Sequence, residues 1–249
     1  MCKVMGIVNV TPDSFSDGGQ FFKPEEAIRR AKNLVADGAD IIDLGGESTR
    51  PGATPIGWEE EWNRIEPVLG KVADLGVLVS VDTYHPETAE RAIAAGAHII
   101  NCVYADPVPE MFRVIADAAQ DTELVMPASC LSNLSNLSNL SNLYLDPMIG
   151  FNTTREEDIE LLRSIPELAR KGRVLIGASR KRIVKKLVGD PPSPRLRRAG
   201  NSVGKNIGGN VGIAVWAAMQ GASVVRVHDV KETVQALRVV ESLKFRVES

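Results

Sequence analysis

Polar side chains follow the apolar, strand-like segments of this 249-residue chain, each at the carboxyl end of its segment. Asp82, Asn101 and Asp146 each come directly after a short run of Val, Leu or Ile, and Lys181 follows another such run after a short loop. Carboxylates accept hydrogen bonds from the amino groups of a nitrogen heterocycle. An amide offers both a donor and an acceptor, and a lysine donates to a ring carbonyl or nitrogen. Together these residue types predict a site for an amino-substituted heterocycle.

A second group of side chains suits an anion. Arg226 and His228 alternate in the last strand-like segment, which places them on one face of it, and arginine binds phosphate oxygens in a bidentate manner. Arg50 lies in the Gly- and Pro-rich segment 45–52, and Asn9 is the one polar residue in the first apolar run. This distribution favours a heterocycle deep in the site and a diphosphate at its rim.

Each of these residues also has an ordinary structural explanation when it is taken alone. Asp82 has the position of a helix cap, and Asp146 precedes a proline as turn-forming residues do. His228 fits a structural role, while Arg50 and Lys181 fit solvated surface charges. The functional interpretation is favoured because the polar groups converge on the same end of most strands.

The elements that would position these residues alternate between strand-like and helix-like patterns. Eight alternations favour one domain over residues 1–249, folded as a closed parallel (β/α)8 TIM barrel rather than an open doubly wound sheet. In such barrels the active site lies at the carboxyl ends of the strands. The predicted strands are 4–10, 40–45, 77–81, 97–103, 123–126, 143–145, 174–176 and 223–227, and the predicted helices are 24–36, 58–75, 86–95, 108–119, 156–170, 209–220 and 230–243.

Two segments depart from this alternation. Residues 131–142 repeat Leu-Ser-Asn four times, and leucines at a period of three drift around an α-helix instead of holding one face. We therefore expect an atypical fifth crossover, with a low-complexity segment in place of the usual loop and helix. The glycine-rich segment 200–210 lacks the spacing of a phosphate-binding loop and is predicted to be a surface loop.

Composition excludes several classes of function. A net charge of −3 provides no basic surface for nucleic acid or anionic lipid. Three scattered cysteines are too few for a disulfide framework, and no apolar run is long enough to span a membrane. With no signal peptide in the sequence, we expect a cytoplasmic protein.

The first apolar run and its loop, Met5–Gly19, closely resemble the first signature of the dihydropteroate synthase family, the pterin-binding enzymes that sulfonamide drugs inhibit. The resemblance implies a TIM barrel that condenses 6-hydroxymethyl-7,8-dihydropterin diphosphate with 4-aminobenzoate to give dihydropteroate and diphosphate. It also implies a Mg²⁺ cofactor and a homodimer. Later motifs of this family are matched in order by residues 45–52, 81–83, 146–151, 177–181 and 226–230.

Motif by motif, the resemblance assigns roles to individual residues. Asn9 would hold Mg²⁺ and diphosphate, and Arg226 and His228 would contact the same anion. The pterin would be bound by Asp82, Asn101, Asp146 and Lys181.

The resemblance also implies four catalytic residues, which are Asp82, Lys181, Arg226 and His228. The second substrate would be bound by other residues. The 4-aminobenzoate site would be bordered by Phe15, Thr49, Arg50, Pro51 and Ser179.

The chain departs from the family pattern at several positions. Cys102 stands where the family has Asp, and Met126–Ala128 replaces a Met-His-Met sequence. Asn152 and Thr153 replace a Gly-Lys pair, and Arg182 stands where a small hydroxyl residue is usual. These departures put full activity in question.

Two alternative functions therefore stay open at this stage. A noncatalytic pterin-binding protein would keep the four pterin residues without turnover. A pterin-dependent methyltransferase on the same barrel would need no diphosphate site, and the presence of Arg226 and His228 argues against it.

Overall fold

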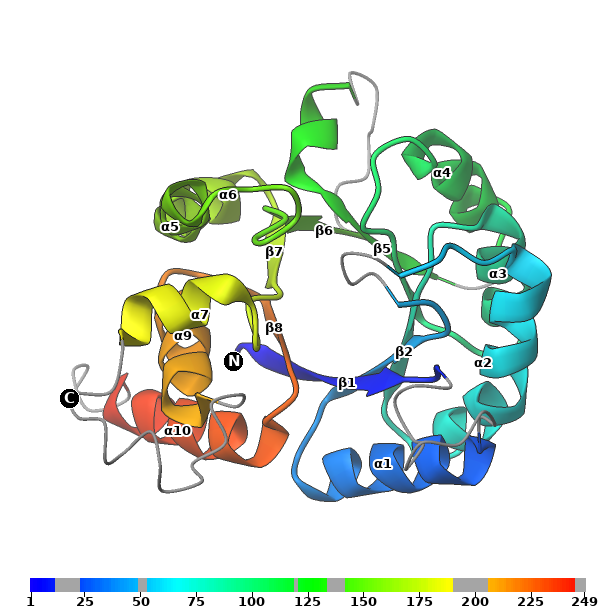
Figure 1. Ribbon diagram of the computed structural model, residues 1–249, viewed down its shortest axis with the longest axis horizontal. Coiled ribbons are helices and arrows are strands. Elements are labelled where there is room, and N and C mark those ends of the chain that lie inside the picture. The colour runs from blue at the N-terminus through cyan, green and yellow to red at the C-terminus, as the bar shows by residue number, and fades with distance from the viewer. Residues whose placement is uncertain (12–22, 49–52, 119–120, 134–141, 190–205, 245–249) are drawn as a thin grey trace.

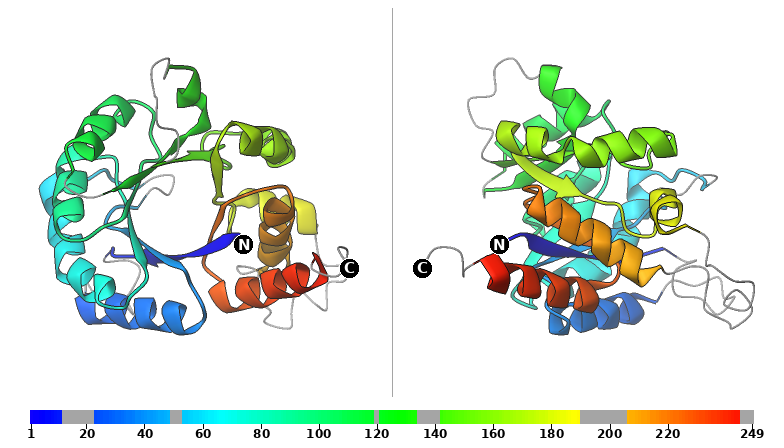
Figure 2. Two further views of the ribbon diagram at one scale, coloured as in Figure 1. Left: turned by 180° about the vertical axis from the view of Figure 1, so that it is seen from behind. Right: turned by 90° about the vertical axis from the view of Figure 1, so that its left-hand side faces the viewer.

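The computed structural model describes residues 1–11, 23–48, 53–118, 121–133, 142–189 and 206–244. Eight parallel strands form a closed barrel in chain order, with helices around its outside (Figures 1 and 2). The predicted TIM-barrel fold is confirmed. The strands are β1 (Lys3–Asn9), β2 (Ile41–Gly45), β3 (Leu78–Asp82), β4 (Ile99–Asn101), β5 (Glu123–Pro127), β6 (Leu143–Asp146), β7 (Arg173–Ile176) and β8 (Val224–Val227).

Strand register aligns the carboxyl ends of the strands. β1 pairs with β2 on one side and with β8 on the other, which closes the ring. Asn9 on β1 is opposite Gly45, Gly45 is opposite Asp82, and Asp82 is opposite Asn101. Residues that are far apart in the sequence therefore lie level with one another at one end of the barrel.

The helices begin and end where local sequence signals place them. Pro24 occupies the first turn of α1, where no amide hydrogen bond is lost, and Gly38 after the helix adopts a positive φ of 99°. The helices are α1 (Pro24–Ala36), α2 (Trp58–Ala73), α3 (Pro86–Ala94), α4 (Val108–Ala116), α5 (Arg155–Arg163), α6 (Ile165–Lys171), α7 (Arg182–Val188), α9 (Ile207–Met219) and α10 (Val230–Lys244).

The structure departs from the predicted helices and loops at three places. The single helix predicted over 156–170 is two helices, because Pro166 lies in the first turn of α6 and starts a new helix after Ser164. Helix α7 was not predicted. The surface loop predicted over 200–210 is wrong for Ile207 and Gly208, where α9 begins two residues before the predicted helix 209–220. Residues 200–205 lie outside the described part of the chain.

The fifth crossover is atypical, as the repeat predicted. A 3-10 helix, η2 (Ala128–Asn133), follows β5, and no α-helix occurs among the described residues between β5 and β6. Most of the repeat, residues 134–141, lies outside the described residues. β5 and β6 nevertheless pair in parallel from Leu124 opposite Leu143 to Pro127 opposite Asp146, so the barrel is continuous across this crossover.

The core has two separate parts. Most buried apolar residues pack between the strands and the surrounding helices. A smaller cluster consists of strand residues alone and fills the amino-terminal half of the barrel interior. We call this cluster the barrel floor; it comprises Met5, Ile41, Ile99, Val125, Tyr144, Leu175 and Val224, with Leu78 packed against it.

Candidate active site

A layer of polar side chains lies directly above the barrel floor. Side chains two positions apart on a strand point to the same side, so the residue two places after each floor residue also faces the interior. On most strands that residue is polar or a glycine. The positions are Asp43 after Ile41, Ser80 after Leu78, Asn101 after Ile99, Asp146 after Tyr144, Gly177 after Leu175 and Arg226 after Val224. Asp82 follows Ser80 by two places and is level with Asn101 at the end of β3.

Arg226 is held by two carboxylates inside the barrel. Its Nε donates to Asp43 Oδ2 at 2.6 Å, and its Nη2 donates to Asp82 Oδ2 at 2.6 Å. Burial acts to lower the pKa of Arg226, but the two carboxylates outweigh burial and raise this pKa above its usual value. The Arg226 guanidinium thus forms ion pairs with both Asp43 and Asp82. Asp43 was not among the residues predicted from the sequence.

Asp82 is a carboxyl of this polar layer whose pKa lies near neutral pH. Burial raises its pKa to about 7, with repulsion from Asp43 and Glu61 in the same direction, while Arg226 and Lys181 oppose the rise. A carboxyl with such a pKa changes charge near neutral pH, which suits a group that holds a polar heterocycle and spreads its charge.

Asn101 closes the same group at the end of β4. Its Nδ2 lies 3.4 Å from Asp43 Oδ2, and its Oδ1 is a buried acceptor with no hydrogen-bond partner among the described residues. A buried polar atom without a partner is costly unless a ligand or water satisfies it. Asn101 therefore offers an acceptor to a ligand in the barrel mouth.

Lys181 and Asp146 face each other from neighbouring strand ends. Lys181 Nζ donates to the Ile149 carbonyl at 2.5 Å and lies 4.1 Å from the centre of the Phe151 ring. Burial lowers the pKa of Lys181 to about 8, and the Asp146 charge opposes this fall. Burial raises the pKa of Asp146, and Lys181 together with the Met148 amide, which donates to Asp146 at 2.7 Å, opposes the rise.

Two glycines keep this part of the interior open. A Cβ built on Gly177 would lie 3.9 Å from both Arg226 Cδ and Asp146 Oδ2, so Gly177 separates the two polar groups. A Cβ on Gly150 would come within 2.9 Å of Lys181 Cδ, and Gly150 also has a φ of 76°. Any side chain at Gly150 would therefore displace the lysine.

His228 lies one residue beyond β8, so its predicted place on the strand is wrong, although it remains close to Arg226. Its Nδ1 is 3.0 Å from Ser179 Oγ, and its amide donates to the same oxygen at 3.2 Å. Burial lowers the pKa of His228 to about 3, and the charges of Arg180 and Arg226 act in the same direction. His228 is therefore neutral at physiological pH and meets an anion as a hydrogen-bond donor rather than a cation.

The remaining predicted residues are only partly placed. Asn9 ends β1, half-buried and level with Gly45. Phe15, Thr49, Arg50 and Pro51 lie outside the described residues. Asp43, which sequence reasoning missed, was signalled by a single carboxylate within the otherwise apolar strand Ile41–Gly45.

Two departures from the family pattern have a structural role here. Thr153 Oγ1 donates to Asp158 Oδ1 at 2.6 Å, and the Gly150 amide contacts both side chains, so the loop after β6 is tied to α5. Arg182 Nη2 lies 3.4 Å from the Thr153 carbonyl and so contacts the same loop. The loop after β6 is thus held by contacts with Asp158 and Arg182.

Comparison with known proteins identifies the family of this chain. The sequence profile of the pterin binding enzyme family matches residues 5–133 and 137–228. The dihydropteroate synthase of Staphylococcus haemolyticus is 36% identical over 262 residues, which cover 97% of this chain and 95% of that protein.

Solved structures give the same result. A Xanthomonas albilineans dihydropteroate synthase with 4-aminobenzoic acid superposes with a TM-score of 0.81 and 35% identity, over 98% of this chain and 93% of that one. The same enzyme in complex with 7,8-dihydropteroate gives a TM-score of 0.77 and 32% identity, over 98% and 94% of the two chains. This chain belongs to the pterin binding enzyme family, and the relatives compared above are dihydropteroate synthases.

Proposed function

We propose that this protein is a dihydropteroate synthase, a transferase that joins 6-hydroxymethyl-7,8-dihydropterin diphosphate to 4-aminobenzoate in folate biosynthesis. The observation that carries the proposal is the polar layer of Asp82, Asn101, Asp146 and Lys181 above the barrel floor. The complexes of the Xanthomonas relative with 4-aminobenzoic acid and with 7,8-dihydropteroate support these two substrates.

The pterin ring fits the polar layer by the chemistry of its edges. Asp146 and Asp82 accept from the amino-substituted edge, Asn101 pairs with a mixed edge through its buried Oδ1, and Lys181 donates to a ring carbonyl or nitrogen. The lowered pKa of Lys181, about 8, leaves it charged at neutral pH. Rigid strand ends and short hydrogen bonds position these groups before the ligand arrives.

The diphosphate would lie at the rim, near Asn9, Arg226 and His228. Mg²⁺ typically takes one or two protein oxygen ligands and completes its shell with substrate phosphates and water, so one amide oxygen from Asn9 fits this ion. Among the described residues no group of three or more His, Cys, Asp or Glu forms a metal site by itself. When bound, Mg²⁺ would neutralise charge on the departing diphosphate.

The reaction forms a C–N bond and breaks a C–O bond. The amino group of 4-aminobenzoate attacks the methylene carbon of the pterin, diphosphate leaves with the bonding electron pair, and the amine loses a proton. An aromatic amine is already a nucleophile, so a strong base is not required. In this proposal Asp82 and Asp146 hold the pterin and spread its developing charge, while Arg226 and His228 act on the leaving group.

We also propose a homodimer that forms through helices α7, α9 and α10. These helices lie on one side of the barrel, and α9 contacts both α7 and α10 (Figure 1). They carry most of the large exposed apolar side chains of the described residues, and exposed apolar surface of this kind is typical of an interaction site. The residues are Leu187, Val188, Ile207, Trp216, Met219, Val239 and Leu243.

A cytoplasmic location is proposed from the cysteines. All three are thiols, and the buried Cys102 donates to the Tyr104 carbonyl at 3.3 Å. Thiols persist in a reducing compartment. In the described part of the chain, no helix has the length and hydrophobicity that a membrane crossing requires.

Calorimetric titration tests the proposed function. The protein is titrated with the pterin diphosphate in the presence of Mg²⁺, then with 4-aminobenzoate, and diphosphate release is measured in the same sample. We expect binding in the first step and release after the second. Pterin binding without release would instead indicate a noncatalytic pterin-binding protein, and no binding would refute the site. Repeating the first step with EDTA tests the Mg²⁺ requirement.

A further inference from the structure

Ser179, Arg180 and Lys181 form a tight turn after β7. The Lys181 amide donates to the Ala178 carbonyl at 3.2 Å, and Arg180, the third residue of this turn, has a φ of 61°. Glycine is the usual residue at such a position, because a side chain is strained at a positive φ. The turn therefore needs contacts from outside to hold an arginine in this conformation.

Two buried side chains supply these contacts. Asn210 Oδ1 accepts from the Arg180 amide at 2.9 Å, and Asp229 Oδ1 accepts from Arg180 Nη2 at 2.7 Å. Asn210 Nδ2 also donates to Asp229 Oδ2 at 3.0 Å, which joins the two contacts into one network. Asn210 and Asp229 are 4% and 8% exposed, and hydrogen bonds to a charged group are strong when water is excluded. Asn210 is thus a bridge between the turn and the residue that follows His228.

A glycine at the start of α9 allows Asn210 to reach the turn. Gly209 precedes Asn210, and a Cβ built on it would lie 2.8 Å from Val184 Cγ1 in α7. Helix α9 therefore packs against α7, the helix that follows the turn, more closely than a side chain at residue 209 would permit (Figure 1). The Gly-Asn pair at the end of the glycine-rich segment thus places a polar side chain beside the turn that carries Lys181.

The turn and the end of β8 carry residues for different parts of the proposed substrate. Lys181 is assigned to the pterin ring and His228 to the diphosphate. Ser179 connects the turn to His228, since its Oγ is 3.0 Å from His228 Nδ1 and accepts from the His228 amide at 3.2 Å. Each of the two site residues also has an anchor of its own. Lys181 Nζ donates to the Ile149 carbonyl, and Arg30 Nη2 donates to the His228 carbonyl at 2.9 Å.

We propose that Asn210 is a positioning residue that fixes the spacing between Lys181 and His228, so that the protein binds the pterin ring and its diphosphate at the same time. This inference rests on the proposed function, which assigns those two parts of the substrate. Because Lys181 and His228 keep their own anchors, the loss of Asn210 leaves each group in the site but alters the distance between them. A ligand with both parts then loses affinity, and a ligand with the ring alone does not.

Two pterin ligands test this separation by calorimetric titration. Asn210→Leu removes both hydrogen bonds of the amide with little change in side-chain volume. We expect the Kd of 6-hydroxymethyl-7,8-dihydropterin diphosphate with Mg²⁺ to rise roughly three- to tenfold, the effect of about one lost hydrogen bond. The Kd of 6-hydroxymethyl-7,8-dihydropterin, which lacks the diphosphate, should stay within about twofold of the wild-type value. An equal rise in the two Kd values would show a merely structural role and overturn the inference.

Exchanging the two buried residues supplies a rescue variant. Asn210→Asp alone brings two carboxylates together and should weaken diphosphate binding at least as much as Asn210→Leu. In Asn210→Asp/Asp229→Asn, the carboxylate at position 210 accepts from the Arg180 amide and from the new amide at position 229, whose oxygen accepts from Arg180 Nη2. All three hydrogen bonds are retained, so we expect the diphosphate Kd to return to within about twofold of the wild type. A double variant no better than Asn210→Asp would refute the proposed bridge.

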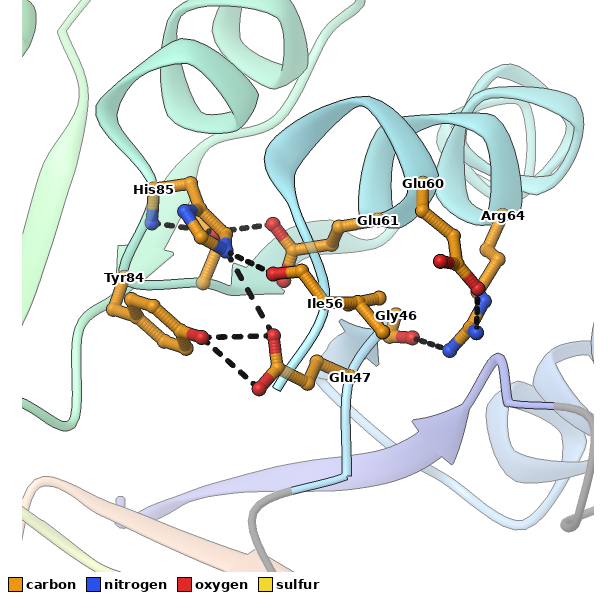
Figure 3. A network of polar contacts seen from close by, with 9 residues as sticks. Gly46, Glu47, Ile56, Glu60, Glu61, Arg64, Tyr84 and His85 are labelled. Carbon is orange, nitrogen blue, oxygen red and sulfur yellow. Dashed lines mark hydrogen bonds and ion pairs between the residues drawn. The ribbon is translucent and has the colours of Figure 1, made fainter. Parts of the chain in front are cut away.

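A second polar network provides the matched control. Tyr84 Oη lies 3.0 Å from both oxygens of the Glu47 carboxylate (Figure 3). This contact joins the residues after β2 and β3, whereas Lys181 and His228 follow β7 and β8. Tyr84→Phe removes a partly buried hydrogen bond near the strand ends, and we expect both Kd values to stay at the wild-type level. A rise in the diphosphate Kd equal to that of Asn210→Leu would show an unspecific effect and count against the inference.

Hydrogen exchange of the Arg180 amide tests the contact without any substrate. This amide donates to Asn210 Oδ1, so its exchange measured by NMR should be slow in the wild type, faster in Asn210→Leu and slow again in the double variant. Equal exchange in the wild type and Asn210→Leu would overturn the inference even if the protein is an active synthase. If the wild type binds neither pterin ligand, the proposed function fails and the substrate part of this inference fails with it, while the exchange result still reports on the contact itself.

Discussion

The Nε of Arg226, on the last strand, donates to the Asp43 carboxylate, on the second strand, at 2.6 Å. The two residues are 183 positions apart in the sequence. Because β8 pairs with β1 and β1 pairs with β2, closing the barrel brings them together in its interior. This contact fixes the guanidinium at the centre of the polar layer, with its Nη2 free to reach Asp82.

Neutralising Asp43 removes half of this charge pairing. Asp43→Asn keeps the shape of the side chain but leaves the buried Arg226 with one carboxylate, so we expect the free energy of unfolding to fall by roughly 1.5–3 kcal/mol. Pterin affinity should fall as well, because the guanidinium loses its fixed orientation. Denaturant unfolding and pterin titration measure the two effects. Asp74→Asn, the same change at the exposed end of α2, is the control; similar losses in both variants would contradict the role of Asp43.

Asp82 makes folding stability depend on pH. Its pKa is raised from 3.8 to about 7 in the folded protein. The folded state therefore keeps the Asp82 proton between about pH 4 and 7 while the unfolded state has released it. The contribution of Asp82 to stability is fully present below pH 4 and is lost as the pH rises to 7, with a slope of at most about 1.4 kcal/mol per pH unit.

Comparing the wild type with Asp82→Asn isolates this effect. The variant cannot titrate at this position, so the difference in unfolding free energy between the two proteins should change across the range from pH 4 to 7. Chemical denaturation at several pH values measures it. A difference that stays constant across the range would show that Asp82 titrates normally.

Lys181 is expected to limit pterin binding at alkaline pH. Its pKa is lowered to about 8, so the ammonium donor is present below that pH and is lost above it. Lys181→Met should weaken binding of the pterin diphosphate about tenfold or more and abolish the alkaline decline. Lys185→Met, on the exposed face of α7, is the control and should bind like the wild type. An alkaline decline that persists in Lys181→Met would assign it to another group.

The apolar surface of α9 is expected to hold the dimer together. Trp216 and Met219 are 47% and 55% exposed on this helix, and a charge placed there would be buried without a partner in the complex. Trp216→Lys should convert the protein to a monomer in analytical ultracentrifugation, with its far-UV circular dichroism unchanged. Lys32→Glu on α1 is the control. A wild type that sediments as a monomer would refute the proposed dimer.

Local sequence patterns predicted most of the barrel. Apolar runs marked the strands and 3.6-residue periodicity marked the helices, because both signals depend on residues close together in the chain. The same patterns missed the break at Ser164, although Pro166 signalled it, and the short helix α7, whose single apolar face is too brief to stand out. These errors arose where a local signal was weak or was given too little weight.

The sequence by itself determined the alternating fold, the polar residues at the strand ends and, through its motifs, the pterin-binding family. Only the tertiary structure decided which of those residues meet. Asp43 pairs with Arg226, Ser179 with His228, and Glu47 with Tyr84 because strand register and barrel closure set their distances. Their charge states followed from the same step, because burial and the neighbouring charges that shift a pKa exist only once distant segments pack together.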